Sequence, residues 1–139
     1  MRRPAGDAGN AIVEFSTLAV LLMVPLVSVL LSVFEVQRAS FGVTEAARQA
    51  GRAYATAEDP AQGRARAAAA ASLAMRDQGL ECNRCLTELA GPLTADARVT
   101  TTVEHFVRLP LLGRVLGSGR GGVPVVATHV EVVDRFRSP

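Results

Sequence analysis

Cys82 and Cys85, three residues apart, form the pattern in this sequence that most invites a chemical interpretation. A C-x-x-C pair serves as a redox couple, as half of a zinc site or as a small structural disulfide. Redox enzymes place the pair at a helix start within a βαβ unit, and no such pattern surrounds it here. His105 and His129 are the remaining candidate zinc ligands, but their wide separation fits no common zinc finger.

The other polar residues form no catalytic arrangement. His105 alternates with valines, which indicates a half-buried strand position, and His129 beside Glu131 indicates a solvated edge. The glycines of residues 117–122 precede no helical pattern and no Lys, unlike a phosphate-binding loop. There is no G-x-S-x-G and no paired-carboxylate arrangement. We therefore predict that the chain is not an enzyme and has no metal, no cofactor and no small-molecule substrate.

Glu14 is a carboxylate at the start of a long uncharged stretch, Phe15 to Phe34. As a helix, 20 such residues extend about 30 Å, the thickness of a bilayer's hydrocarbon core. Helices of soluble proteins seldom stay apolar all round for so long, and the stretch exceeds the apolar part of a signal peptide, about 7–15 residues. We expect a transmembrane helix over residues 10–35, with a kink at Pro25.

Basic residues indicate the orientation of this helix. Arg2 and Arg3 precede it against one acid, Asp7, which favours a cytoplasmic N-terminus. The expected location is the cytoplasmic membrane, crossed once, with the C-terminal domain extracytoplasmic. On that oxidising side a Cys82–Cys85 disulfide is the default state, with free thiols and a metal site as alternatives.

Length and charge restrict the remaining functions. The 139 residues allow one domain besides the membrane segment. A net charge of +2 is too small and too dispersed to indicate a nucleic-acid partner. All 15 basic residues are Arg, which points to a GC-rich bacterial genome.

The helical pattern continues beyond the span. Apolar residues recur at helical spacing from Val36 to Tyr54, and Ala47 with Gly51 forms a small-xxx-small pair that allows close packing. That pair fits a partner helix or the chain's own domain equally well. We predict one helix from Ala11 to about Thr56, roughly 70 Å long, of which residues 36–57 form an extracytoplasmic stalk.

Residues 58–139 are predicted to form a small α+β extracytoplasmic domain. Asp59 is suited to cap a second helix that has Pro60 at its first position, continues through the Ala-dominated residues 61–78 and ends at Gly79. The fold class is therefore α+β, with a small antiparallel β-hairpin or sheet after the second helix.

Two alternating, β-branched segments predict the strands, residues 97–108 and 125–136. A Leu-rich piece, 109–116, and the glycine-rich stretch 117–122 lie between them, so the simplest topology is an antiparallel pair with a long insertion. In the second strand, alternation puts four residues on one face: Val126, Thr128, Val130 and Val132.

Gly9, followed after four residues by Glu14-Phe15, lies between a basic leader and an apolar helix. This arrangement resembles the processing site of type IV prepilins, in particular of the Flp or tight-adherence branch. The resemblance implies that a membrane-embedded prepilin peptidase removes the leader, residues 1–9, so that the mature chain begins at Asn10. It also implies that Glu14 and Phe15 contact a neighbouring subunit, whose α-amino group pairs with the Glu14 carboxylate.

Val-Glu-Phe at 13–15, the apolar span and Glu-Ala-Ala-Arg-Gln-Ala-Gly-Arg-Ala at 45–53 together are similar to the TadE-like family. These are minor pseudopilins of tight-adherence pilus systems, and the likeness covers roughly residues 9–57. Family members usually carry their proline earlier in the span than Pro25. The family similarly ends in a strand, a connector bearing proline and leucine, and another strand.

The resemblance implies assistance in assembling a thin pilus, with the membrane, a prepilin peptidase and other pilin or pseudopilin subunits as partners. The alternative hypothesis is a signal-anchored extracytoplasmic domain of unrelated structural or binding function. A third is a membrane-tethered metal or redox protein that uses Cys82 and Cys85.

Overall fold

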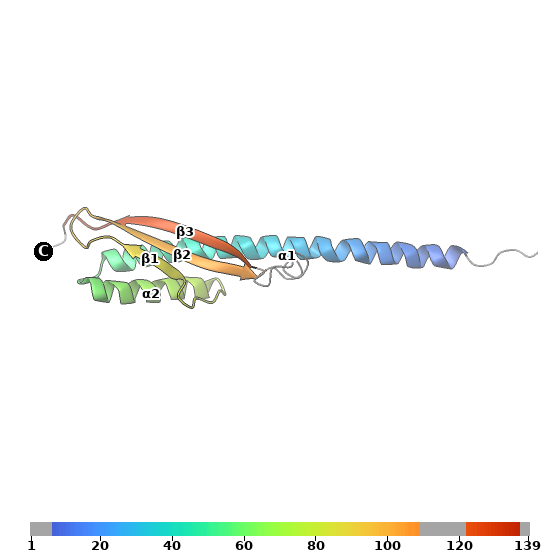
Figure 1. Cartoon of the computed structure of the whole chain (residues 1–139), viewed down its shortest axis with the longest axis horizontal. Helices are drawn as coiled ribbons and strands as arrows, with labels where there is room; N and C mark the ends of the chain where they lie inside the picture. Colours follow the sequence, from blue (N-terminus) through green and yellow to red (C-terminus); the bar gives the residue numbers. More distant parts are fainter. Residues whose placement is uncertain (1–6, 109–121, 137–139) are drawn as a thin grey trace, which may run out of the picture. The chain divides into compact units, whose positions relative to one another are not determined.

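The computed structural model describes residues 7–108 and 122–136, with side chains from residue 11 onward (Figure 1). The predicted Leu-rich piece, 109–116, and residues 117–121 of the predicted glycine-rich loop, 117–122, lie outside the described residues, whereas Gly122 is the first residue of a strand and not part of a loop. The elements follow in the order α1 (Asp7–Ala55), α2 (Pro60–Asp77), β1 (Leu86–Ala90), β2 (Arg98–Arg108) and β3 (Gly122–Val132). The predicted α+β class is confirmed, as is one long first helix. The chain divides within α1 into two compact units, Met1–Phe34 and Glu35–Pro139.

The first unit contains the apolar part of α1. Its large hydrophobic side chains from Ile12 to Phe34 are exposed, with fractions from 44% to 75%. Water does not stabilise a helix that is apolar all round, whereas lipid or other helices do. Within the part of the chain that the structure describes, α1 is the one helix long and apolar enough to span a membrane.

Three of the four hydroxyl side chains in this part of α1 are satisfied by the helix itself. Each donates to the carbonyl four residues earlier: Thr17 to Val13 at 2.7 Å, Ser28 to Val24 at 2.8 Å and Ser32 to Ser28 at 2.8 Å. These bonds remove the need for water at the hydroxyl hydrogens. The helix continues through Pro25.

The second unit has two layers. Residues 35–55 of α1 and the whole of α2 form one layer, and an antiparallel sheet of order β1-β2-β3 forms the other (Figure 1). Alanines dominate the helical side of the core, and valines dominate the sheet side. The fully buried residues include Ala39, Ala46, Ala47, Ala50, Ala67, Ala71, Met75, Val99 and Val103.

α2 begins and ends as the sequence predicts. The Asp59 carboxylate accepts from the backbone N–H groups of Ala61 and Gln62, both at 2.9 Å, and Pro60 occupies the first turn. Gly79 follows the helix with a φ of +67°, a conformation that glycine adopts at little cost. Met75 is the bulky side chain that α2 buries, while Leu73 remains exposed.

The predicted antiparallel pair is confirmed, with β2 and β3 in register from Arg98↔Val132 to Arg108↔Gly122. The predicted bounds of the second strand, 125–136, are wrong at both ends. β3 stops at Val132: the Val133 N–H still donates to the Ala97 carbonyl at 2.8 Å, but the Ala97 N–H donates to the Thr94 carbonyl at 3.0 Å, so the ladder is not continued. The four residues predicted to share one face of the second strand lie on the exposed face of the sheet: Val126, Thr128, Val130 and Val132.

β1 was not predicted from the sequence. Its residues, Leu86–Ala90, contain one β-branched side chain, Thr87, and a register irregularity between Leu86 and Glu88. Such a segment has little intrinsic preference for a strand, so the pairing with β2 stabilises it.

Tyr54, near the end of α1, joins the helical layer to the turn after β1. Its hydroxyl donates to the Gly91 carbonyl at 3.2 Å, and its ring covers Gly63 of α2. Gly91 has a φ of +136°, and a Cβ placed there would clash with the Arg98 carbonyl oxygen. The chain therefore needs glycine where β1 turns toward β2.

We predict that Gly91→Ala destabilises the second unit by about 1–3 kcal/mol, because the methyl group meets backbone and the conformation is strained. Gly51→Ala is the matched control, since its added Cβ would make contacts no closer than 3.4 Å. Denaturant unfolding of the full chain in detergent measures both. Equal stability of the two variants would contradict this account of Gly91.

Candidate functional site

Cys82 and Cys85 are joined by a disulfide in the connection between α2 and β1. Cys85 is 5% exposed, and its carbonyl accepts from the N–H of Glu104 on β2 at 2.8 Å. Between the cysteines, Arg84 has a φ of +62°, which few non-glycine residues adopt. The predicted disulfide thus closes a small loop at the start of the sheet.

The two histidines lie on neighbouring strands. His105 on β2 is half-buried, as predicted. His129 on β3 faces α1, and its Nε2 lies 3.2 Å from Glu131 Oε2, with side-chain exposures of 31% and 28%. β3 is an edge strand, as predicted for His129, but the His129 side chain is half-buried against α1 rather than solvated. Within residues 7–108 and 122–136, no three His, Cys, Asp or Glu side chains are grouped as metal ligands.

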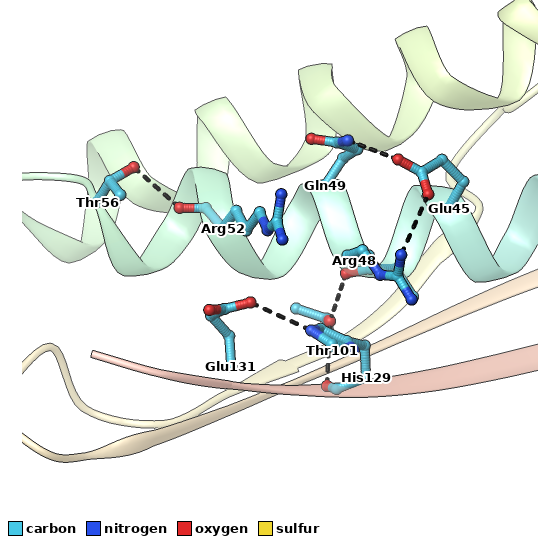
Figure 2. Close-up of polar contacts among 9 residues, drawn as sticks. Glu45, Arg48, Gln49, Arg52, Thr56, Thr101, His129 and Glu131 are labelled. Atoms are coloured by element: carbon cyan, nitrogen blue, oxygen red, sulfur yellow. Dashed lines mark hydrogen bonds and ion pairs between the residues drawn. The ribbon is translucent and has the colours of Figure 1, made fainter. Parts of the chain in front are cut away.

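A buried hydroxyl connects the sheet to α1. Thr101 of β2 is fully buried, and its Oγ1 lies 2.8 Å from the Ala47 carbonyl and 3.3 Å from the His129 carbonyl (Figure 2). A hydroxyl has one hydrogen to donate, so the shorter contact to Ala47 is the principal bond. This bond satisfies Thr101 in a core that water does not reach.

Gly51 of α1 lies against the sheet. A Cβ on Gly51 would lie 3.4 Å from atoms of Thr101, His129 and Glu131. Ala47, one turn earlier, is fully buried. The sequence allowed Ala47 and Gly51 to pack against a partner helix or against the chain's own domain. In the structure they pack against the chain's own sheet.

The opposite side of α1 is polar. Glu45 accepts from Gln49 at 2.6 Å and lies 4.0 Å from Arg48, and Thr56 donates to the Arg52 carbonyl (Figure 2). Exposed pairs of this kind contribute little to stability, so they mark a solvated helix face.

The processing residues lie on the first turns of α1. Gly9 and Asn10 are helical, and their surroundings lie outside the described side chains. Glu14 is exposed and makes no ion pair with another described residue, and Phe15 is 74% exposed. The helix therefore presents both residues outward.

Two depressions in the second unit were not predicted from the sequence. One, of about 1320 Å³, lies where the α1–α2 turn meets the end of β3 and includes Arg52, Leu93 and Phe136. The other, of about 670 Å³, includes Arg38, Arg84 and Arg108. Each combines residues far apart in the sequence, and no local spacing signals such a site.

Comparison with protein-family models finds no match, and comparisons with curated proteins and with solved structures find none either.

We predict that thiol labelling of protein purified from the cell envelope is negligible without reductant and reaches two groups per chain after reduction. The variant with Cys82→Ser and Cys85→Ser should lose about 2 kcal/mol of stability, since the unfolded chain loses a four-residue loop closure. Full labelling of the unreduced protein would contradict the bridge. Stoichiometric zinc that disappears in Cys82→Ser would favour the metal hypothesis instead.

Proposed function

We propose that this protein is a minor pseudopilin of the TadE-like type, which assists assembly of a tight-adherence pilus from the cytoplasmic membrane. One observation carries the proposal: α1 exposes its apolar side chains from Ile12 to Phe34 and continues as the same helix into an α+β unit. Exposed apolar surface of this extent requires lipid or neighbouring helices. Both are available to a subunit stored in a membrane and packed laterally during assembly.

Glu14 supports prepilin-type processing over a plain anchor. A carboxylate near hydrocarbon is unfavourable, by up to about 2.5–3.5 kcal/mol at mid-membrane, and no described residue pairs with it. Cleavage after Gly9 creates an α-amino cation at Asn10, four residues earlier. Pairing Glu14 with that cation on a neighbouring subunit offsets the desolvation of both charges and sets the axial stagger of the helices.

The packing of α1 indicates where subunits meet. The chain's own β2 and β3 pack against Ala47 and Gly51 and cover them. Lateral contacts of the kind proposed here therefore involve the first unit, where the apolar surface is uncovered.

The disulfide agrees with the proposed location of the second unit. A Cys82–Cys85 bridge persists in an oxidising compartment and is rare in the cytosol. Arg2 and Arg3 favour a cytoplasmic N-terminus when the helix inserts, so the second unit lies on the extracytoplasmic side of the membrane.

We predict that the mature protein, made beside its own peptidase, begins at Asn10. Gly9→Val should block cleavage, because the isopropyl group fills space that the peptidase needs at the scissile bond. Gly6→Val introduces the same side chain three residues earlier and should leave cleavage unchanged. Intact-mass analysis distinguishes these results. A wild-type chain that starts at Met1 or Arg2, with normal piliation, would leave the signal-anchored domain as the better hypothesis.

We further predict that Glu14→Ala leaves membrane insertion intact and weakens association with neighbouring subunits. The substitution removes a carboxylate without adding bulk, so the apolar helix inserts at least as well. Glu45→Ala is the matched control, since it removes a half-buried acid of α1 outside the span. Cross-linking in the membrane measures association. Loss of association in both variants, or in neither, would argue against a special role for Glu14.

A further inference from the structure

The depression of about 670 Å³ in the second unit has an unusual concentration of charge. Three arginines and three glutamates line it: Arg38, Arg84, Arg108, Glu35, Glu81 and Glu104. Its volume lies in the usual range of ligand sites, about 300–1,000 Å³. A polar site of this size is suited to a small charged group.

Most of these charges are not neutralised by each other. Glu35 and Arg38 form an ion pair at 3.0 Å on α1. Arg84, Arg108, Glu81 and Glu104 make no ion pair within residues 7–108 and 122–136. Among the described residues, two cations and two anions thus line one depression without an ion pair of their own, an arrangement that suits a ligand carrying both signs.

Separate elements hold the charged groups in place. Arg38 extends from α1 toward the end of α2, where its Nη1 lies 3.7 Å from the position of a Cβ on Gly79. Arg84 lies between the bridged cysteines at a positive φ, and Arg108 ends β2. The backbone of the cationic residues is therefore set by a helix, a closed loop and a strand rather than by one flexible segment.

The depression lies next to the membrane surface if the span is inserted as proposed. Glu35 follows Phe34, the last residue of the apolar stretch, and Arg38 is one helical turn further. Phe106, 60% exposed, also lines the depression. Apolar side chains such as Phe next to arginines are typical of protein surfaces at the boundary between the headgroups and the acyl chains.

We infer that this depression binds the headgroup of a zwitterionic phospholipid, one that carries a phosphate and an ammonium group. Arg84 and Arg108 donate charge-assisted hydrogen bonds to the phosphate. Glu81 and Glu104 accept from the ammonium. The balance of charges distinguishes this site from a basic patch, which would favour a purely anionic lipid. The inference rests on the proposed membrane insertion and is independent of processing.

Native mass spectrometry of the uncleaved full chain tests the inference. The protein is inserted into nanodiscs with equal amounts of phosphatidylethanolamine and phosphatidylglycerol of the same acyl chains, then released into detergent. We expect phosphatidylethanolamine to be retained about tenfold over phosphatidylglycerol, equivalent to about 1.4 kcal/mol. Equal retention of the two lipids would overturn the inference.

Paired variants separate the two halves of the site. Arg84→Gln with Arg108→Gln should lose both lipids, whereas Glu81→Gln with Glu104→Gln should keep phosphatidylglycerol and lose the preference. Arg64→Gln with Arg66→Gln, on the exposed face of α2, is the matched control and should behave as wild type. Wild-type behaviour of the first two pairs would reject the assigned residues.

Two further results distinguish a lipid from a soluble ligand, and failure of the headgroup site from failure of the proposed membrane function. Glycerophosphoethanolamine, which has the headgroup without acyl chains, should not displace the lipid, and displacement at low concentration would assign the site to a soluble ligand instead. A chain that does not enter the nanodisc contradicts the proposed membrane function itself. A chain that enters but shows no lipid preference contradicts the headgroup site alone.

Discussion

The close approach of the sheet to α1 is the contact on which the rest of the second unit depends. The small side chain of Ala47 lets β2 approach until the Thr101 hydroxyl donates to the Ala47 carbonyl at 2.8 Å, and Gly51 lies against the same strands. Burying an alanine removes one methyl group from water, worth about 0.8 kcal/mol. Such a core gains little from any one side chain. Its stability therefore depends on close contacts throughout and on a few larger residues such as Met75 and Val99.

A thin core gives the polar and covalent links in this unit more weight. The Asp59 cap, the hydrogen bond from Tyr54 to Gly91 and the disulfide each fix a connection between elements. They lie in the α1–α2 turn, the turn after β1 and the loop before β1. Together they hold short connections that a small apolar core would order poorly.

α1 is one continuous helix whose two parts have different surroundings. Its first part exposes large apolar side chains, and its second part buries small ones beneath a sheet. The change occurs near Phe34 and Glu35, where the two units divide. This division underlies the proposed pseudopilin function. Lateral contacts between subunits require the exposed apolar surface of the first part of α1, because the chain's own sheet already covers the second part. The proposed headgroup site lies at the same point of the chain, in the second unit.

The sequence by itself determined the elements whose signals are local. The apolar length of the span, the continuity of α1, the Asp59–Pro60 start of α2 and the alternation of β2 and β3 depend on residues within a few positions of each other. Helix caps and strand periods are set by backbone hydrogen bonds and side-chain direction, which short segments already specify. The Cys82–Cys85 bridge was predicted from the short C-x-x-C spacing and the expected oxidising compartment.

Only the tertiary structure decided which surfaces meet. Alternation defined two faces of β3 but not that His129 would face α1 and the valines would be exposed. The sequence allowed Ala47 and Gly51 to pack against either a partner helix or the chain's own sheet. β1 forms because its backbone pairs with that of β2. The charged depression joins Arg38, Arg84 and Arg108 from three elements. The physical reason is common to all of these: burial and pairing depend on contacts between distant segments, which local periodicity does not encode.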